Sequence, residues 1–553
     1  MVKKVAIIGA GASGLTALKV CFAEYGFDAW CFEKTHDLGG LWRYKPEECD
    51  GEASVMKSTV INASKEMMSY SDFPPPAEYP NFMHNRDVLE YFRSYSRTFG
   101  LFDRIKYNTE ILSVKRADDY DSTGSWQIVT KNLKTGEITV ETYDAVFSCT
   151  GHHACPYTAP IKGIADGAFQ GRVIHSHSYK DPRGYEDKRV LVVGVGNSGG
   201  DIAVELSRTA EKVYLVARRG TWVLNRIHDK GKPLDMALST RFFQNIKALF
   251  PNLVTAFAEY KVNRRFDHAK YGIKPRHHIF QQHPTINDEL PNRIQCGSII
   301  VKPNVKGVQS PNTILFEDDS RAENIDVVIM CTGYSFGFPY LEDGKLIPVE
   351  ENRVKLYKQM FVPDLAHPET LAIIGCFEAI GALMPVSEMQ SRVACELLKE
   401  DTSVRLPSRS AMREDINRKT EVMRLRYVES RRHTLLVDYI SFMDELAKII
   451  GAKPSALAFA FKDPRLALSI VFGPCLPYQY RLTGPHPWKG ARDAQLTAWD
   501  RAWHPTRSVI GACGNGRCTC PEGSRCKVKA AAQKVILAAL IVFLFFLILL
   551  AIF

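Results

Sequence analysis

The chain of 553 residues lacks several features by which common classes of protein are known. It has no long block of lysine and arginine and no interleaving of basic with aromatic residues, so we expect no nucleic-acid partner; its net charge of +10 is modest for this length. It shows no Ser/His/Asp arrangement, no paired-carboxylate signature and no Cys-x-x-Cys pair. These absences argue against a hydrolase that relies on its own acids and bases, and against a dithiol–disulfide reductase.

Neither a disulfide framework nor a secretory signal is expected. The 14 cysteines are mostly scattered through apolar runs, as at Cys31, Cys149 and Cys331, which is typical of reduced and buried thiols. The first residues, MVKKVAII, lead directly into an expected strand. An apolar fraction of 45% and a charged fraction of 24% are ordinary for a globular protein, and the length predicts two or more domains.

One run stands out because it has no charge at all. Residues 535–553 are 19 uncharged residues, and as a helix they would span roughly 28 Å, close to the hydrocarbon thickness of a bilayer. Lys527, Lys529 and Lys534 precede the run, and a basic flank is expected to stay in the cytosol. We therefore predict a C-terminal transmembrane anchor with membrane lipid as a partner. The sequence leaves open whether residues 455–482 lie on the membrane surface or pack on the main body.

Two segments resemble each other: VAIIGAGASGLTALKV and VLVVGVGNSGGDIAVEL. In each, a short β-branched run is followed by Gly-x-Gly-x-x-Gly and an apolar helical pattern, which predicts a strand, a tight turn and a helix. The N-terminus of such a helix binds the pyrophosphate of a dinucleotide. The residues predicted to form the two sites are Gly9, Ala10, Gly11, Ala12, Ser13 and Gly14 in the first, and Gly194, Gly196, Asn197, Ser198, Gly199, Gly200 and Asp201 in the second.

The first site is predicted to bind FAD. Glu33 ends the following strand, 19 residues after Gly14, where a carboxylate accepts hydrogen bonds from both hydroxyls of a ribose and repels a 2′-phosphate. This excludes NADP but leaves FAD and NAD. The next segment, HDLGGLWRY, favours the flavin, because Gly40 permits close approach to an extended cofactor while Leu41 and Trp42 supply apolar walls. Ordinary core packing is the alternative for the tryptophan.

The second site is predicted to bind NADPH. Arg218 lies 19 residues after Gly199, in the place that the acid holds in the first site, and Arg219 follows it. A guanidinium binds a 2′-phosphate through two parallel, charge-assisted hydrogen bonds. The alternative is that both arginines are simply solvated, and the sequence does not say which of the two makes the contact. Together, the two sites predict hydride transfer from NADPH to a flavin.

The predicted fold class is α/β, with two Rossmann-like domains, the NADPH domain inserted into the FAD domain, a helical insertion and a C-terminal membrane helix. The seams are marked by AVFSCTG and VVIMCTG, two apolar runs that both close on Cys-Thr-Gly. The predicted boundaries are 1–154 and 331–450 for the two parts of the FAD domain, 155–330 for the NADPH domain with an insertion at about 222–295, 451–534 for a membrane-proximal region and 535–553 for the anchor.

The segment FQGRVIHSHSYK, residues 169–180, carries a family resemblance. It fits the pattern Phe-x-Gly-x-x-x-His-Ser-x-x-Tyr-Lys at Phe169, Gly171, His175, Ser176, Tyr179 and Lys180. With GAGASGL, LGGLWRY, INASKEMMSYSDFP and LPNRI, it makes the chain resemble the vertebrate-type flavin-containing monooxygenases over nearly its whole length. The related Baeyer–Villiger monooxygenases have Trp at the position of Tyr179. One departure is Cys331, where the family usually has Ala.

The resemblance implies a function and a site. In this family, reduced FAD reacts with O₂ to form a C4a-hydroperoxide, which oxygenates soft nitrogen and sulfur centres of small xenobiotic-type amines and thioethers, while NADP⁺ stays bound. It implies that Asn62 is catalytic, as an amide donor in a dry site, and that Lys34, Ile61 and Ala63 lie beside the cofactor. A turn asparagine is the plainer interpretation of Asn62. Baeyer–Villiger oxygenation of ketones and release of H₂O₂ as an NADPH oxidase are alternatives.

Other features stay open at this stage. The resemblance and the apolar run together imply an endoplasmic reticulum membrane protein with its catalytic part on the cytosolic face, and a homo-oligomer is neither favoured nor excluded. His175 and His177 have no partners at metal-ligand spacing, so no metal is predicted. The cluster Cys513, Cys518, Cys520 and Cys526 is not spaced as a zinc site; unremarkable thiols, acylation and metal binding are the alternatives. The physiological substrate is not evident.

Overall fold

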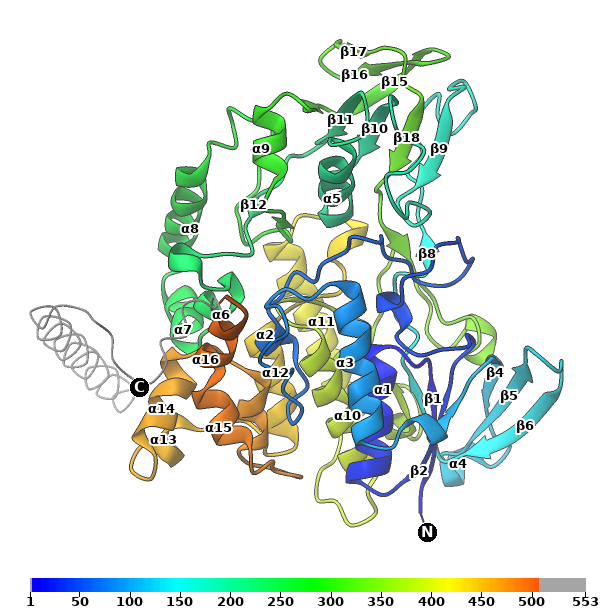
Figure 1. The fold of residues 1–553 in the computed structure, drawn as a ribbon. Coiled ribbons are helices and arrows are strands. Elements are labelled where there is room, and N and C mark those ends of the chain that lie inside the picture. Colours follow the sequence, from blue (N-terminus) through cyan, green and yellow to red (C-terminus); the bar gives the residue numbers. More distant parts are fainter. Residues whose placement is uncertain (1, 507–553) are drawn as a thin grey trace, which may run out of the picture. The chain divides into compact units, whose positions relative to one another are not determined.

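The computed structural model describes residues 2–506 (Figure 1). The chain divides into two compact units, Met1–Ala502 and Trp503–Phe553. The predicted anchor at 535–553, its basic flank and the four clustered cysteines lie outside the described residues. Within residues 2–506, no helix combines the length and the apolar character that crossing a bilayer requires.

Two five-stranded parallel sheets organise the first unit. Each is built around a strand that runs straight into a glycine-rich turn, and the central strands are buried on both faces, as expected for parallel sheets covered by helices. The first sheet has the order β20-β7-β1-β2-β3, with bounds Leu371–Ile373, Ala145–Ser148, Lys4–Ile8, Asp28–Phe32 and Ile105–Lys106. The second has the order β14-β11-β10-β18-β9, with bounds Ile299–Lys302, Lys212–Val216, Arg189–Val193, Val327–Met330 and Arg172–His175.

The chain passes between the two sheets twice, and the two passages pair with each other. β8 (Cys155–Pro156) runs antiparallel to β19 (Tyr334–Ser335). The second sheet is therefore formed by residues between these two short strands, whereas the first sheet takes β20 from beyond them. The remaining strands are β4 (Thr109–Arg116), β5 (Trp126–Asn132), β6 (Ile138–Tyr143), β12 (Val223–Leu224), β13 (Thr285–Ile286), β15 (Val305–Ser310), β16 (Thr313–Phe316), β17 (Arg321–Ala322), β21 (Glu378–Ile380) and β22 (Leu436–Asp438).

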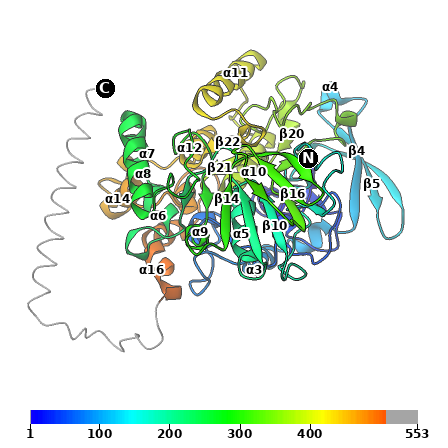
Figure 2. The same ribbon diagram turned by 90° about the horizontal axis from the view of Figure 1, so that it is seen from above.

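Helices cover the sheets. α1 (Ala12–Lys19) and α10 (Met384–Leu398) pack together in the core beside the first sheet, and α5 (Asn197–Leu206) lies against β10 and β11 of the second (Figures 1 and 2). The other α-helices are α2 (Lys65–Met68), α3 (Asn85–Thr98), α4 (Tyr120–Thr123), α6 (Leu234–Leu238), α7 (Arg241–Leu249), α8 (Pro251–Arg265), α9 (Leu290–Gln295), α11 (Arg409–Arg426), α12 (Tyr439–Ile449), α13 (Ala456–Phe459), α14 (Pro464–Phe472), α15 (Ala491–Leu496) and α16 (Ala498–Trp503).

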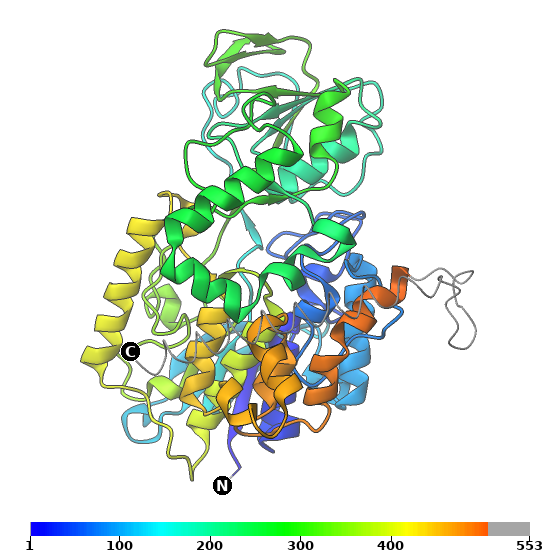
Figure 3. The ribbon, with the colours of Figure 1, turned by 90° about the vertical axis from the view of Figure 1, so that its left-hand side faces the viewer.

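The segment predicted as an insertion at about 222–295 is largely helical. Thr240 caps α7 by accepting a hydrogen bond from the backbone N–H of Phe243 at 3.0 Å. Soon after α7 ends, α8 begins at Pro251; the first residue of a helix needs no N–H for an intrahelical hydrogen bond, so a proline is tolerated there. Figure 3 shows these green helices reaching from the second sheet toward the orange helices. Phe242 and Phe472, with ring centroids 5.1 Å apart, join α7 to α14.

The two parts of the 455–482 segment differ in their packing. Its last part enters the core: the side chain of Arg481 is 1% exposed and donates hydrogen bonds to Glu24, Ser71 and Glu388. Its first part, around α13 and α14, leaves apolar side chains in solvent, including Phe461, which is 98% exposed. The core contacts of the last part tie it to Glu24, just beyond α1, and to α10, both far from it in sequence.

Candidate functional site

The first glycine turn brings the chain too close to itself for any side chain. Gly9 has φ of +96°, and a Cβ there would lie 2.9 Å from the carbonyl oxygen of Cys149. A Cβ on Gly14 would lie only 1.7 Å from the carbonyl oxygen of Gly9. Gly11 is the N-cap of α1 and has no side chain to cover the N–H groups at the start of that helix. The turn thus forms a cradle of backbone N–H groups that a phosphate fits.

The acid and the second glycine pair predicted for the first site converge on this turn. Glu33 is buried at the end of β2, and its Oε2 accepts a hydrogen bond from the backbone N–H of Ala10 at 2.8 Å. Its Oε1 accepts from the hydroxyl of Thr35 at 2.7 Å, which holds the carboxylate beside the cradle. A Cβ on Gly40 would lie 3.0 Å from the Cα of Gly11, so this pair approaches the turn closely. The fit to an adenosine ribose and pyrophosphate is good.

The other residues predicted for the first site are less uniform. Ser13 shares a hydrogen bond of 3.0 Å with Ser387 on α10, and Trp42 is partly buried against the main core, as the plainer interpretation expected. Ile61 and Ala63 are buried in that core as well. Lys34 points elsewhere, because its Nζ donates to the carbonyl of Gly51. Ala12 and Leu41 are half-buried.

The second turn repeats the first almost atom for atom. Gly194 has φ of +108°, and a Cβ there would lie 2.6 Å from the carbonyl oxygen of Cys331; one on Gly199 would lie 1.9 Å from the carbonyl oxygen of Gly194. The two Cys-Thr-Gly echoes therefore have a structural meaning beyond marking seams. In each half, the cysteine carbonyl lies against the first glycine of its turn. A Cβ built on the third glycine would lie 3.5 Å from the cysteine Cβ in the first half and 3.4 Å in the second.

Two side chains predicted for the second site turn toward the insertion, and Gly200 lies against it. Asn197 accepts a hydrogen bond from the backbone N–H of Ile286 at 2.9 Å, and Asp201 accepts one from the amide of Asn287 at 2.8 Å. A Cβ on Gly200 would lie 3.3 Å from the methyl group of Thr285. Burial raises the pKa of Asp201 to about 6. In this structure these residues hold β13 against α5, while Ser198 is exposed at the helix start.

The two arginines after β11 differ. Both are exposed. Arg219 donates from Nη1 to the backbone carbonyl of Glu429 at 3.2 Å. Arg218 has no hydrogen bond or ion pair with any residue in the described part of the chain. An exposed guanidinium without a partner at this position is free to take a 2′-phosphate.

Asn62 is held by the insertion. Its Oδ1 accepts a hydrogen bond from Nη2 of Arg226 at 2.8 Å, and Nη1 of the same arginine pairs with Asp288 at 2.8 Å. Two residues on, the backbone N–H of Ser64 donates to Asp235 of α6 at 2.6 Å. Sequence reasoning missed Arg226, Asp235 and Asp288 of the insertion. The available signal was that Arg226 closely follows the short strand β12 and Asp288 closely follows β13.

A cavity of about 240 Å³ lies beside this contact. Its walls include Met56, Val60, Asp201, Glu205, Arg226 and Asp288. A larger cavity of about 510 Å³ lies around Pro363 and Met412 and shares no lining residue with either nucleotide turn. The smaller cavity thus lies next to Arg226, the partner of Asn62.

The fingerprint segment at 169–180 bridges the two nucleotide sites. Tyr179 donates to Glu205 of α5 at 2.8 Å, and Nε2 of His177 lies 2.7 Å from the carbonyl oxygen of Glu52, in the segment that follows the flavin-site glycines. Lys180 donates to Ser54 in the same segment. Burial lowers the pKa of His175 to about 4, so this imidazole is neutral at neutral pH.

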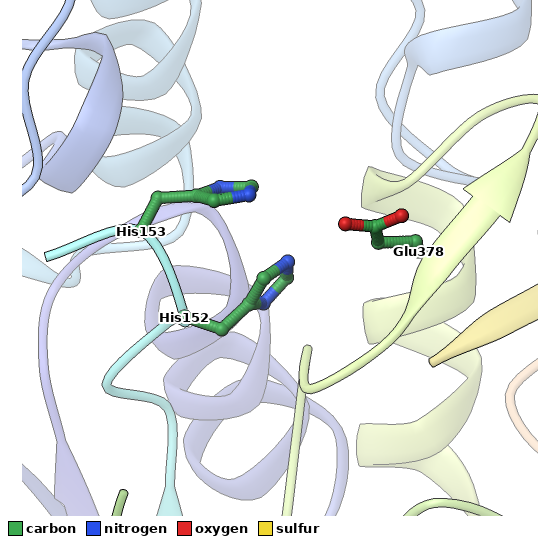
Figure 4. A group of neighbouring side chains, drawn as sticks. All are labelled: His152, His153 and Glu378. Carbon is green, nitrogen blue, oxygen red and sulfur yellow. The ribbon is translucent and has the colours of Figure 1, made fainter. Parts of the chain in front are cut away.

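A cluster that sequence reasoning missed lies at the seam after β7. His152, His153 and Glu378 point toward one another and offer ligand atoms within 4.8 Å of each other (Figure 4). Burial lowers the pKa of His152 to about 4 and raises that of Glu378. Two adjacent histidines at a strand end were the available signal. Arg432 acts electrostatically on both His153 and Glu378, and its positive charge disfavours a cation here.

The two glycine turns form two nucleotide-binding sites. An acid, Glu33, suited to a free ribose lies at the first, and an arginine, Arg218, suited to a 2′-phosphate lies at the second. Such a pair is typical of an oxidoreductase that works with a flavin and a nicotinamide cofactor. The sequence model of the family described as FMO-like, flavin-binding monooxygenase-like, matches residues 2–546, and the chain belongs to this family. This confirms the family resemblance and the prediction of an enzyme that is a flavin-containing monooxygenase with FAD and NADPH as cofactors.

Individual proteins agree with this assignment. Over 509 residues the chain is 48% identical to "Flavin-containing monooxygenase 5" of Rattus norvegicus, covering 92% of this chain and 94% of that protein. It is 44% identical over 510 residues to "Dimethylaniline monooxygenase [N-oxide-forming] 2" of Oryctolagus cuniculus, with the same coverages. The solved S-allyl-L-cysteine S-oxygenase of Allium sativum has a TM-score of 0.63 at 23% identity, covering 92% of this chain and 99% of that one. This last likeness confirms the mixed α/β fold.

Proposed function

We propose that the enzyme oxygenates soft nitrogen and sulfur centres of small molecules, such as tertiary amines and thioethers, with NADPH and O₂. The observation that carries the proposal is the Asn62–Arg226 hydrogen bond of 2.8 Å. It holds a neutral amide in a half-buried position, and within residues 2–506 the amide has no hydrogen bond with a carboxylate or imidazole. The name of the rabbit relative refers to N-oxide formation, and the garlic structure is an S-oxygenase.

Each residue of the site has a distinct part in this reaction. A bound flavin would supply hydride acceptance from NADPH and activation of O₂, so that one oxygen atom goes to the substrate and the other to water. Glu33 holds the ribose of FAD, and the Gly9–Gly14 turn receives its pyrophosphate. Because Oδ1 of Asn62 is fixed by Arg226, its Nδ2 is left as a donor that supplies a hydrogen bond but no readily released proton.

The insertion has the role of excluding water. Arg226 and Asp235 tie it to the loop of Asn62, and Asp288 pairs with Arg226 beside the small cavity. A water-poor site strengthens the amide hydrogen bond and suppresses loss of activated oxygen as H₂O₂.

Product analysis tests the proposal. The full-length enzyme is incubated separately with trimethylamine, a dialkyl sulfide and a simple ketone, and product, NADPH consumption and H₂O₂ release are measured together. The expected result is N-oxide and sulfoxide formation in proportion to NADPH consumed, with little H₂O₂. An ester formed preferentially from the ketone would instead assign Baeyer–Villiger oxygenation. H₂O₂ formed in proportion to NADPH with every substrate would assign an oxidase.

We also propose that the enzyme is attached to the endoplasmic reticulum membrane with its catalytic part in the cytosol. The uncharged run at 535–553 supports an anchor. A group of exposed apolar side chains supplies a second lipid contact. They come from the helical segments around α8 and α13 and include Leu249, Phe250, Leu253, Phe257, Leu457 and Phe461.

Truncation separates the two membrane contacts. Removal of 535–553 is expected to leave flavin binding intact and to make the protein extractable by high salt or mild detergent. Adding Phe257→Glu and Phe461→Glu to the truncation is expected to release the remaining protein from vesicles of anionic phospholipid. If the truncated form and its double variant pellet equally with membranes, the attachment lies elsewhere.

A further inference from the structure

The N-terminus of α5 faces an arginine from a distant part of the chain. A Cβ built on Gly196, the N-cap of that helix, would lie 3.1 Å from Nη1 and 3.6 Å from Cζ of Arg432. The guanidinium therefore lies directly against the second glycine turn. Within residues 2–506 it forms no hydrogen bond and no ion pair, although it is half-buried. Glu378 acts on it electrostatically, without a hydrogen bond or ion pair.

This arrangement is unfavourable without an anion. The free N–H groups at the start of a helix carry partial positive charge, and a guanidinium is a donor with no acceptor. Donors thus face donors across the turn, and neither satisfies the other. The neighbouring imidazoles of His153, His283 and His433 offer no compensation, because burial, with Arg432 adding to it, lowers their pKa and keeps them neutral.

The segment around Arg432 spans the second site from end to end. At one end, Arg219 donates to the carbonyl of Glu429; three residues later, Arg432 reaches Gly196. The backbone N–H of Val428 also donates to the carbonyl of Gln281 in the insertion, at 3.0 Å. A dinucleotide whose 2′-phosphate lies at the arginines after β11 and whose pyrophosphate lies at the turn would run along this segment.

The segment is anchored on the flavin side. β22 follows it within a few residues and pairs with β21, which carries Glu378. The preceding residue, Arg431, is used differently: it donates to Ser335 at 3.1 Å, pairs with Glu351 and lies 4.3 Å above the ring of Tyr157. Arg431 therefore fixes the segment in place, and the guanidinium of Arg432 lies against the second glycine turn.

We propose that Arg432 binds the pyrophosphate of NADPH and so ties the nicotinamide cofactor to the flavin side of the enzyme. The inference rests on the assignment of NADPH to the second turn. Arg432 is a positioning residue: its two N–H groups would complete the anion site begun by the backbone of α5, and the bound cofactor would link two parts of the fold that sequence separates by more than 200 residues. This contact slows release of NADP⁺.

The test is nucleotide binding to the oxidised, flavin-loaded, full-length enzyme, measured by calorimetry. Arg432→Gln is expected to raise the Kd of NADP⁺ and of NAD⁺ by the same factor, about tenfold or more, because both carry the pyrophosphate, and Arg432→Lys is expected to recover part of the loss. Arg424→Gln, an exposed arginine of α11 paired with Glu421, makes the same change in net charge and should leave both constants unaltered. An unchanged Kd for NADP⁺ in Arg432→Gln, or a loss confined to NADP⁺, overturns the proposal.

A second measurement decides the matter if Arg432→Gln does not retain flavin. In the unmodified enzyme, NADP⁺ should protect the backbone amides of residues 431–433 from hydrogen exchange, whereas 2′-AMP, which lacks the pyrophosphate, should not. Equal protection by both ligands, or by neither, contradicts the inference. Because no substrate is present, these outcomes are independent of whether the enzyme oxygenates nitrogen, sulfur or carbon.

Discussion

Arg226 donates a hydrogen bond of 2.8 Å to Asn62, although 164 residues separate the two in sequence. The contact connects the helical insertion to the loop that the family resemblance marks as catalytic. It fixes one end of the Asn62 amide and thereby orients the other. If Asn62 acts as proposed, the insertion shapes the chemical site, and variants on either side of the contact should show its effect.

Replacing Asn62 should separate reduction of the flavin from oxygenation. We expect Asn62→Ala to bind FAD and to be reduced by NADPH normally, but to form product about a hundredfold more slowly while NADPH is consumed with release of H₂O₂, since one preorganised donor is lost. Stopped-flow absorbance after mixing the reduced enzyme with O₂ checks this. If reoxidation by O₂ and product yield match the unmodified enzyme, Asn62 is only a turn residue.

Replacing Arg226 should have a smaller effect of the same kind. In Arg226→Gln the amide of Asn62 keeps its chemistry but loses its fixed orientation, and we expect oxygenation to fall about tenfold with a higher share of H₂O₂. The measurement is the ratio of product to NADPH consumed. Arg208→Gln is the matched control, because Arg208 lines the same cavity but pairs with Glu289 away from Asn62. Equal ratios in the two variants would refute the coupling.

The arginine pair after β11 should contribute unequally. Arg218 has no partner in the described part of the chain, whereas Arg219 is already engaged by the carbonyl of Glu429. We expect Arg218→Ala to raise the KM for NADPH about tenfold or more without changing that for NADH, and Arg219→Ala to do less. Initial rates of flavin reduction with both cofactors provide the comparison. A larger loss in Arg219→Ala would assign the 2′-phosphate to that residue instead.

The buried cluster around Arg481 should matter for stability and not for chemistry. Its guanidinium is 1% exposed and binds Glu24, Ser71 and Glu388. Arg481→Met removes the buried cation that Glu388 and Glu24 share, although Glu24 keeps its pair with Lys19. The expected loss is about 3–5 kcal/mol of unfolding free energy. Chemical denaturation of the flavin-loaded enzyme measures it. Arg492 is half exposed and pairs with Asp463, so Arg492→Met should lower the unfolding free energy by less than about 1 kcal/mol. Equal losses in the two variants would mean that burial of the Arg481 cluster does not add to its contribution.

The same cluster predicts how stability depends on acid. Burial raises the pKa of Glu24, but Arg481 and Lys19 outweigh it and lower the pKa from 4.5 to about 2. A lowered pKa means that the folded state holds the ionised form, so the contribution to stability is present above pH 4.5 and is lost as the pH falls toward 2. Thermal midpoints between pH 6 and 3 should fall less steeply in Glu24→Gln. Parallel curves would show that another group controls the acid range.

Much of the site was predictable because the signals are local. In both halves, 19 positions separate the last glycine of the turn from the charged residue after the next strand. This spacing predicts that Glu33 lies near the first turn and Arg218 near the second. The chemistry of an acid and of a guanidinium then predicts which ribose each site accepts. The helical character of the insertion also followed from its pattern. The roles of Asn197 and Asp201 were less evident, because their side chains are taken up by β13 in this structure.

The sequence by itself determined two nucleotide cradles, their opposite ribose preferences and the family of the enzyme. Only the tertiary structure decided which distant residues meet: Arg226 and Asn62, Arg432 and Gly196, and Arg481 and the core carboxylates. The physical reason is that a turn is specified by the backbone freedom of a few adjacent residues, whereas these contacts depend on how separate segments pack. No periodic pattern in the local sequence shows which side chain, two hundred residues away, a given segment will contact.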